Sequence, residues 1–76
     1  MALRNNQSYL MGQYRVWAKR GEDGLFILTS LPRHSYVWRV ESDGTLSAKD
    51  GDRWIPEPRF RLRDLDEIVG SVEVEY

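Results

Sequence analysis

The sequence predicts a mainly β domain, either a small antiparallel barrel or a strongly curled sheet of five or six strands, with one short helix before the last strand. Two observations carry this prediction. Apolar and polar residues alternate with a period of two through much of the chain, which is typical of half-buried strands. Clusters of Gly, Asp, Ser and Pro interrupt the alternation at short intervals, as in hairpin connections. An α+β arrangement, with the helix packed on an open antiparallel sheet, is the alternative.

Length and composition set the limits of the domain. The 76 residues, 41% hydrophobic and 30% charged, suffice for one small core and leave no room for a second. We expect residues 1–8 to be a flexible N-terminal segment and residues 9–76 to form a single β-rich domain. Residues 1–8 lack the apolar stretch of a signal peptide, and no apolar run approaches the roughly 18 residues of a membrane span. We therefore expect a soluble, cytoplasmic protein without membrane contact.

Two hairpins are predicted in the first two thirds of the chain. Residues 9–19 alternate as one long strand, and the sequence RGEDG at 20–24 has the composition of a hairpin loop. Residues 25–31 follow as a strand whose first four residues are all apolar, which favours burial on both faces. Pro32 ends it because proline has no N–H for a sheet ladder. Residues 36–48 form the second predicted hairpin around the SDG turn at 42–44.

The last third of the chain is predicted to contain one more turn, an interrupted strand and the helix. After the turn at 49–53 the sequence PEP at 56–58 separates Trp54 and Ile55 from an extended segment at 59–63. Residues 64–70 then read as a helical turn or two, with Asp64 as N-cap, Glu67 at the third position and Gly70 as terminator. The alternating residues 71–76 form the closing strand. This order of hairpins, helical turn and closing strand resembles a small SH3-like barrel in architecture only, and the resemblance implies no function and no site residues.

Three arginines share one side of the extended segment 59–63: Arg59, Arg61 and Arg63. If this segment lies beside the closing strand, the arginines face Glu73 and Glu75 in an internal salt-bridge row, each pair contributing about 0.2–1 kcal/mol. If the two strands are apart, guanidinium groups about 6.7 Å from one another would form an anion-binding ridge suited to phosphates. We favour the internal row, since both alternations and the short connection fit it.

A second candidate surface combines aromatic and basic side chains. Trp17 lies between Arg15 and Lys19 on one face of the first predicted strand, and Arg39 could extend this surface. An aromatic ring flanked by cations can stack a base or another planar group. The structural alternative, which we weigh equally, is that Trp17 packs across the hairpin against Phe26 and Leu28.

The other tryptophans have structural interpretations. Trp38 alternates with Tyr36 and Val40, and we expect it in the core. Trp54, ahead of Pro56, is expected to anchor a loop to the core.

Catalytic and metal-binding patterns are absent from the sequence. There is no cysteine, and His34 lies in a turn directly beside Ser35, where adjacent side chains point apart and form no catalytic pair. The acidic turn residues Asp43, Asp50 and Asp52 do not match a calcium loop. We expect no catalytic residue, no metal site and no cofactor.

These observations leave two functional hypotheses. The first is a small non-catalytic protein-interaction module or accessory subunit that binds a protein partner or self-associates, for example as a homodimer. The second is a nucleic-acid or anionic small-ligand binding domain that uses the Arg/Trp surface. The net charge of −1 favours the first hypothesis, because general nucleic-acid binders are basic.

Overall fold

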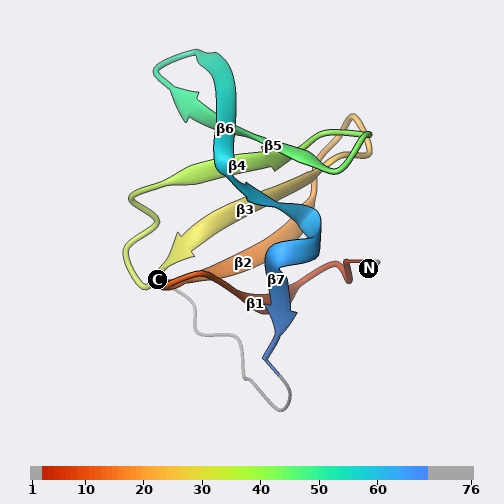
Figure 1. The fold of residues 1–76 in the computed structure, drawn as a ribbon, viewed down its shortest axis with the longest axis vertical. Coiled ribbons are helices and arrows are strands. Elements are labelled where there is room, and N and C mark those ends of the chain that lie inside the picture. Colours follow the sequence, from red (N-terminus) through yellow and green to blue (C-terminus); the bar gives the residue numbers. More distant parts are fainter. Residues whose placement is uncertain (1–2, 69–76) are drawn as a thin grey trace.

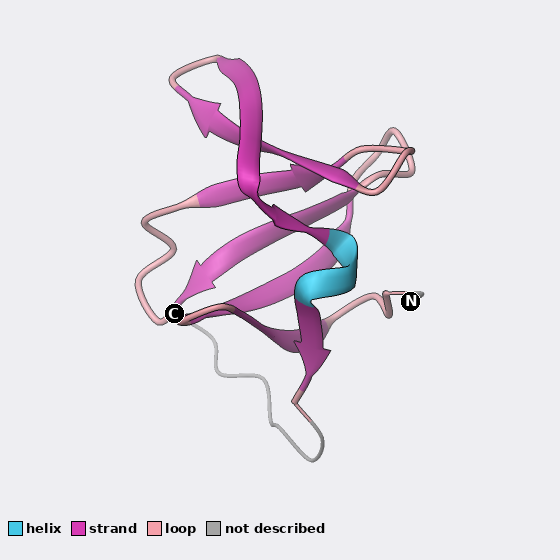
Figure 2. Cartoon of the chain, viewed as in Figure 1, coloured by secondary structure: helices cyan, strands magenta, loops and turns pink. Residues whose placement is uncertain are grey.

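Seven antiparallel strands form a single sheet in the computed structural model of the protein, which describes residues 3–68. The sheet is open and strongly curled into a half-barrel (Figures 1 and 2). Its strand order is β6-β5-β4-β3-β2-β1-β7. The elements are β1 (Gln7–Met11), β2 (Tyr14–Arg20), β3 (Phe26–Leu31), β4 (Val37–Val40), β5 (Thr45–Asp50), β6 (Arg53–Arg61), the 3-10 turn η1 (Leu62–Asp64) and β7 (Leu65–Glu67). The prediction of a mainly β, strongly curled sheet is confirmed, whereas the predicted strand count and helix are wrong.

The core lies on the concave face of the curled sheet. Residues paired across neighbouring strands point to the same face, and the register places Val16 opposite Tyr9, and Leu28 opposite both Ala18 and Trp38. All five are buried. The curl thus lets one sheet enclose its own apolar face, and the predicted core position of Trp38 is confirmed because only 2% of this residue is exposed.

The two edges of the sheet are connected by a short strap, formed by the end of β6, η1 and β7. The chain leaves one edge at β6, turns through η1, and adds β7 to the opposite edge, where Leu65 pairs with Met11. In Figure 1 this path crosses over the strands of the sheet. The Leu62 N–H donates to the Gly44 carbonyl at 2.9 Å, which ties the strap to the β4–β5 turn. The strap therefore partly covers the open side of the half-barrel, which we call its mouth.

The predicted long strand at 9–19 is two strands. The chain reverses at Gly12 and Gln13, so that Met11 pairs with Tyr14. Gly12 has φ +60°, a left-handed conformation that glycine adopts without steric penalty. A turn of two residues barely interrupts a period-two alternation, which is why the pattern reads as one continuous strand.

The other predicted hairpin turns agree with the structure. The turn at 20–24 joins β2 to β3, and the SDG turn at 42–44 joins β4 to β5. The turn at 49–53 is tighter than predicted, because β5 extends to Asp50 and β6 begins at Arg53. Most of the hairpin order was therefore readable from turn residues alone.

The PEP sequence does not interrupt its strand, contrary to the prediction. β6 runs continuously from Arg53 to Arg61 through Pro56 and Pro58. Proline is tolerated there because β6 is an edge strand. The pairing is irregular instead: Leu46 is opposite Glu57, whereas the preceding Thr45 is opposite Arg61, so residues 58–60 bulge out of the ladder.

The predicted helix at 64–70 is also corrected. Its described part consists of the last residue of η1, the three-residue strand β7 and Ile68. The Asp64 carboxylate accepts a hydrogen bond from the Arg61 N–H at 2.8 Å, so it stabilises the preceding turn instead of beginning a new helix. β7 pairs with β1, and this tertiary pairing holds the segment extended. The predicted closing strand at 71–76 lies outside the described residues.

The predicted flexible segment, residues 1–8, has several contacts with the sheet in its described part. Leu3 packs against the core, and the Arg4 N–H donates to the Tyr9 hydroxyl at 2.8 Å. The Arg20 N–H donates to the Asn5 side-chain oxygen at 2.8 Å. Residues 7 and 8 already belong to β1. Among residues 3–68, no helix is long and apolar enough to cross a membrane.

Candidate functional site: an aromatic hollow at the mouth of the half-barrel

The four residues of the predicted Arg/Trp surface lie on the outer, convex face of the sheet. Arg15, Trp17 and Lys19 alternate in β2 with the buried Val16 and Ala18. Across the sheet, Lys19 and Arg39 are both opposite Ile27, and Trp17 is opposite Ser8 and Thr29. The structure therefore brings these predicted residues to one face.

Trp17 is half-buried on this outer face, while Arg15 and Lys19 are exposed. The proposed packing of Trp17 against Phe26 and Leu28 does not occur across the hairpin, because Leu28 is opposite Ala18 on the concave face. The register thus removes that particular structural alternative, and a binding role for Trp17 stays a prediction.

Arg39 is already engaged by neighbours within the molecule. Its Nε lies 2.8 Å from a Glu41 carboxylate oxygen, and its guanidinium lies 4.8 Å from the centre of the Trp54 ring. Hydrogen bonds from Ser47 and then from Arg39 lower the pKa of Glu41. Trp54 is half-buried under this cation. The Arg39 guanidinium is therefore held by contacts within the molecule and is not a free cation on the outer face.

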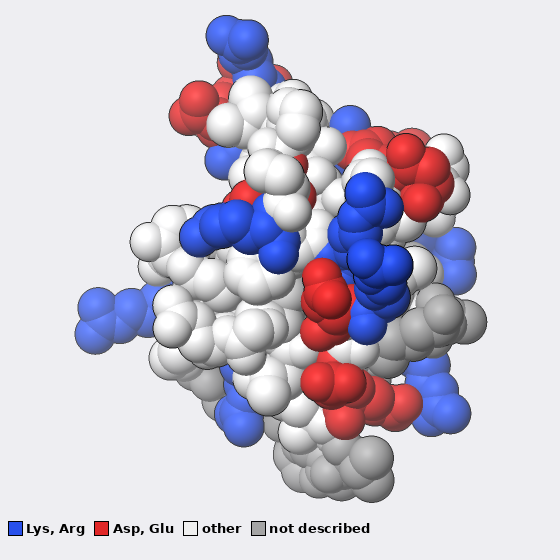
Figure 3. Space-filling model, in the orientation of Figure 1, with Lys and Arg blue, Asp and Glu red and all other residues white. Residues whose placement is uncertain are grey.

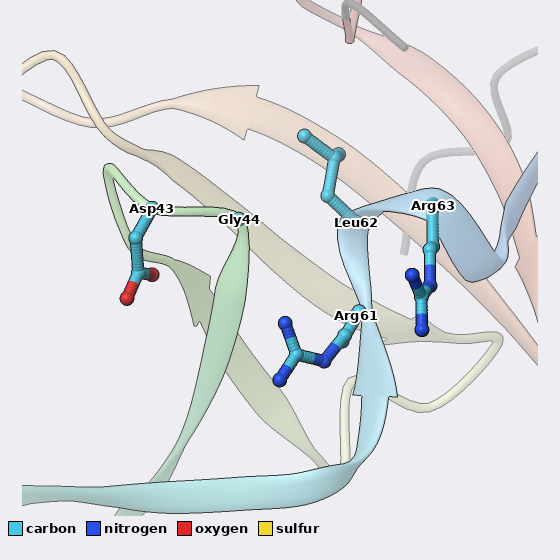
Figure 4. Close-up of a pocket in the computed structure, with 5 residues that line it drawn as sticks. All are labelled: Asp43, Gly44, Arg61, Leu62 and Arg63. Atoms are coloured by element: carbon cyan, nitrogen blue, oxygen red, sulfur yellow. The ribbon is translucent and has the colours of Figure 1, made fainter.

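The three arginines of residues 59–63 are separated by the bulge in β6 and by η1. The Arg59 guanidinium forms a two-point hydrogen bond with Glu57, at 2.7 and 3.1 Å. Arg61 and Arg63 instead line a hollow of about 210 Å³ beside Gly44 (Figure 4). The predicted row with Glu73 and Glu75 lies outside the described residues. Arg59 thus lines one hollow, whereas Arg61 and Arg63 line another.

One hollow is lined by aromatic side chains at the mouth of the half-barrel. It has a volume of about 270 Å³, and its walls include Tyr14, Tyr36, Trp38, Glu57 and Arg59. The Tyr14 ring centre is 5.7 Å from that of Tyr36 and 5.3 Å from that of Trp38. We call this site the aromatic hollow.

Tyr36 is the accessible member of the aromatic hollow. It is 56% exposed, whereas Trp38 is only 2% exposed. Phe60 supports the site from the bulge, with its ring centre 6.1 Å from that of Tyr14. The hollow therefore has a fixed floor and one large aromatic ring that a ligand can contact.

Ser30 holds Tyr36 in place. The Tyr36 N–H donates to the Ser30 hydroxyl at 2.8 Å, and the Ser30 N–H donates to the Tyr36 carbonyl at 2.9 Å. Ser30 itself is buried at the end of β3. The last residue before β4 is thus attached by two hydrogen bonds to the rigid sheet, which orients an otherwise exposed side chain.

An ion pair between Glu57 and Arg59 forms the polar rim of the aromatic hollow. The Glu57 side chain is 9% exposed and the Arg59 side chain is 62% exposed. The hydrogen bonds from Arg59 are the main reason that the pKa of Glu57 lies below its ordinary value, and the Trp38 side chain lowers it further. The nearly buried carboxylate stays ionised and paired, while the arginine presents its outer N–H groups to solvent.

The lowered carboxyl pKa values predict that acid destabilises the fold. Glu41 and Glu57 have folded pKa values below the ordinary 4.5, and Thr45 hydrogen bonds lower the pKa of Asp43 below 3.8. The unfolded chain therefore binds more protons, so these contributions are complete above pH 4.5 and are lost as the pH falls through the folded values. Urea midpoints should fall across that interval. The substitution Glu57→Gln should make the urea midpoint less dependent on pH than Glu22→Gln does, because Glu22 lies in an exposed loop. If the midpoints of the two variants depend equally on pH, the ion pair of Glu57 does not contribute to the acid sensitivity.

Sequence reasoning placed two residues of the aromatic hollow in strands but missed their role. Tyr14 lies within the predicted strand 9–19, Tyr36 alternates with Trp38 in the second predicted hairpin, and Glu57 lies in the PEP sequence that is predicted to interrupt a strand. The available signal was the 12% aromatic content of this short chain. Their meeting point depends on the β2–β3–β4 register and on the bulge that brings Phe60 and Arg59 over Tyr14.

The size and chemistry of the aromatic hollow indicate what it can accept. Its volume of about 270 Å³ is below the roughly 300–1,000 Å³ typical of small-molecule sites. One or two side chains of a longer ligand fit this space better than a whole cofactor does. In the described part of the chain, no group of three or more His, Asp or Glu residues could hold a metal ion.

No protein-family model, curated protein or solved structure matches the chain.

Proposed function

We propose that the protein is a non-catalytic interaction module that receives an extended, proline-containing segment of a partner protein in the aromatic hollow. The observation that carries this proposal is the 56% exposed Tyr36 beside Tyr14 and Trp38. Aromatic-lined grooves bind polyproline-type segments, because these segments are already extended and lose little entropy on binding. Tyrosine rings add apolar contact area and a hydrogen-bonding tip at low entropic cost.

The edges of the described sheet favour this mode of binding over strand addition. β6 carries prolines at positions 56 and 58, and prolines in edge strands place their missing N–H on the solvent side. A partner strand would find no donor at either position. β7, at the other edge, is only three residues long. Recognition by side chains in a hollow is therefore better supported than recognition by the sheet backbone.

Tyr36→Ala should weaken peptide binding without unfolding the protein. The probe is a neutral, acetylated and amidated proline-rich peptide, titrated against the full chain by NMR. We expect shift changes at Tyr14, Tyr36 and Trp38. Loss of a central tyrosine contact of about 2 kcal/mol would weaken binding about 30-fold, while the urea midpoint should stay nearly unchanged because the ring is exposed.

Two variants control this experiment. Tyr36→Phe keeps the ring and should retain affinity to within about threefold, the effect of one exposed hydroxyl. Leu10→Ala removes a 43% exposed apolar side chain on the outer face and should change nothing. The proposal would be refuted if the NMR shift changes were confined to the surroundings of Trp17 and the Tyr36→Ala variant bound the peptide as tightly as the unchanged protein does.

The second candidate function is binding of a nucleic acid or an anionic small ligand at the outer face. The observation in its favour is that Arg15, Trp17, Lys19 and Arg39 share that face. A single-stranded oligonucleotide in the same titration separates the two functions. Shift changes around Trp17, with affinity falling steeply with salt, would favour this second function.

The proposed interaction function also covers the architecture, the oligomeric state and the location of the protein. An SH3-like architecture is compatible with the curled sheet and with the short turn before β7. Self-association as a homodimer and a role as an accessory subunit are variants of the interaction function, and a cytoplasmic location is part of the same proposal. A mass measurement in solution tests the dimer directly.

A further inference from the structure

A second hollow lies along the same strap as the aromatic hollow. It has a volume of about 210 Å³ and is lined by Asp43, Gly44, Arg61, Leu62 and Arg63. Figure 4 shows the Arg61 and Arg63 side chains on the same side of the chain, with Asp43 across the Gly44 turn. We call this site the arginine hollow.

The two sites are linked by a third hollow between them. Glu57 lines both the aromatic hollow and a hollow of about 260 Å³ formed with Pro58 and Phe60. Arg61 lines both that intermediate hollow and the arginine hollow. Neighbouring hollows therefore share a lining residue, and the three follow one another in order along β6 and η1.

The charged side chains along this path differ in whether they already have a partner within the molecule. The Glu57 carboxylate is nearly buried and paired with Arg59. Asp43 is hydrogen-bonded by the Thr45 hydroxyl at 2.6 Å and by the Thr45 N–H at 3.0 Å. Among the described residues, no carboxylate oxygen lies within ion-pair distance of the Arg61 or Arg63 guanidinium. Figure 3 shows basic side chains in two groups near the centre of this face, separated by uncharged surface.

We propose that the partner segment is acidic, with a carboxylate side chain that binds between Arg61 and Arg63 when its apolar residue occupies the aromatic hollow. This inference rests on the proposed function. Arginine forms strong two-point hydrogen bonds with carboxylates, and both guanidiniums are on exposed residues. A single carboxylate suits the site better than a phosphate chain does, because the acidic side chains of Asp43 and Asp64 nearby disfavour a ligand of higher negative charge.

The test compares two peptides that differ only in charge. Each peptide has a pair of prolines, and after it every second residue, three in all, is glutamate in one peptide and glutamine in the other. At low salt we expect the glutamate peptide to bind about tenfold more tightly, as for a gain of about 1.4 kcal/mol from charged hydrogen bonds. High salt should reduce the difference by screening. The double variant Arg61→Gln/Arg63→Gln should abolish the difference in affinity between the two peptides.

A matched control removes the same charge elsewhere. Arg15→Gln/Arg33→Gln changes two exposed arginines outside the three hollows and should keep most of the tenfold preference. If the Arg61/Arg63 variant keeps the preference in full, or if both double variants lose it equally, the acidic-partner inference is overturned. Binding of the glutamine peptide and its loss in Tyr36→Ala report on the proposed function separately.

A single-stranded oligonucleotide with the same net charge as the glutamate peptide tests whether the arginine hollow recognises phosphates instead. If it binds more tightly than the glutamate peptide, and the Arg61/Arg63 variant weakens it, the arginine hollow recognises phosphates and the acidic-peptide inference is overturned. Tighter binding of the glutamate peptide supports the inference.

Discussion

Trp38→Ala should unfold a large part of the protein at room temperature. The side chain is in the centre of the concave face, opposite Leu28 and Ala48, and its ring contacts those of Tyr14 and Tyr36. Removing a buried tryptophan costs about 3–5 kcal/mol. A domain of this size with no cysteine for a disulfide rarely has more than about 3–5 kcal/mol of net stability. The two quantities are equal within their spread, so half of the protein or more should be unfolded by far-UV circular dichroism.

Trp54→Ala is the matched control for this prediction. Trp54 is half-buried on the outer face, where it packs beneath Arg39 and near Lys49. Its loss should cost less than about 2 kcal/mol, the range for a partly exposed side chain with cation–π contacts, and the protein should stay folded. Equal urea midpoints for the two variants would show that Trp38 is not a central core residue.

Gly12→Ala should be the second most damaging substitution. A left-handed φ of +60° costs a residue with a Cβ about 1–2 kcal/mol. The added Cβ would also lie 2.8 Å from a Phe60 ring carbon, and overpacking of this kind costs about 1–3 kcal/mol more. The Phe60 ring packs near Tyr14 and beneath the Arg59 guanidinium, so a shift that relieves the clash would disturb both contacts. The urea midpoint of the variant should therefore fall markedly.

Gly24→Ala separates the two contributions to this loss. Gly24 has φ +86° but no heavy atom within 4 Å of the position of an added Cβ, so it should show the backbone cost alone. The double variant Gly12→Ala/Phe60→Leu should be more stable than the sum of its single changes, because the smaller side chain relieves the clash. If Gly12→Ala and Gly24→Ala are equally stable, the contact with Phe60 has no energetic weight.

The turns and the single β-rich core were predictable because their causes are local. The SDG turn at 42–44 and the glycine-containing loop at 20–24 determine hairpins through residues adjacent in sequence. The burial of Trp38 followed from its alternation with apolar neighbours. Gly12 escaped prediction because a two-residue turn leaves the alternating pattern almost intact. The helix predicted at 64–70 failed because a capping pattern is a weak preference, which the pairing of β7 with β1 overrides.

The candidate site was less predictable than the fold. Arg15, Trp17, Lys19 and Arg39 do share a face, as alternation within strands and hairpin pairing imply. Alternation also puts Arg39 and Glu41 on one strand face, but the contact of Arg39 with Trp54 joins two strands and cannot be read from sequence neighbours. Arg59, Arg61 and Arg63 are not carried by one regular strand, because residues 58–60 bulge and Arg63 belongs to η1, and their predicted row with Glu73 and Glu75 stays a prediction. A bulge shifts side chains between faces, and it depends on the partner strand.

The sequence by itself determined the period-two burial pattern, most of the reversals of the chain and the absence of a cysteine nucleophile, since these depend on residue type and on interactions between near neighbours. Only the tertiary structure decided that β7 joins β1, that Tyr14 and Tyr36 meet beside Trp38, and that Arg61 and Arg63 line one hollow. The first two juxtapositions join residues more than twenty positions apart, and the third depends on the Gly44 turn that lies beside Arg61 and Arg63. The curl of the sheet and the path of the strap fix them, and no local preference encodes either.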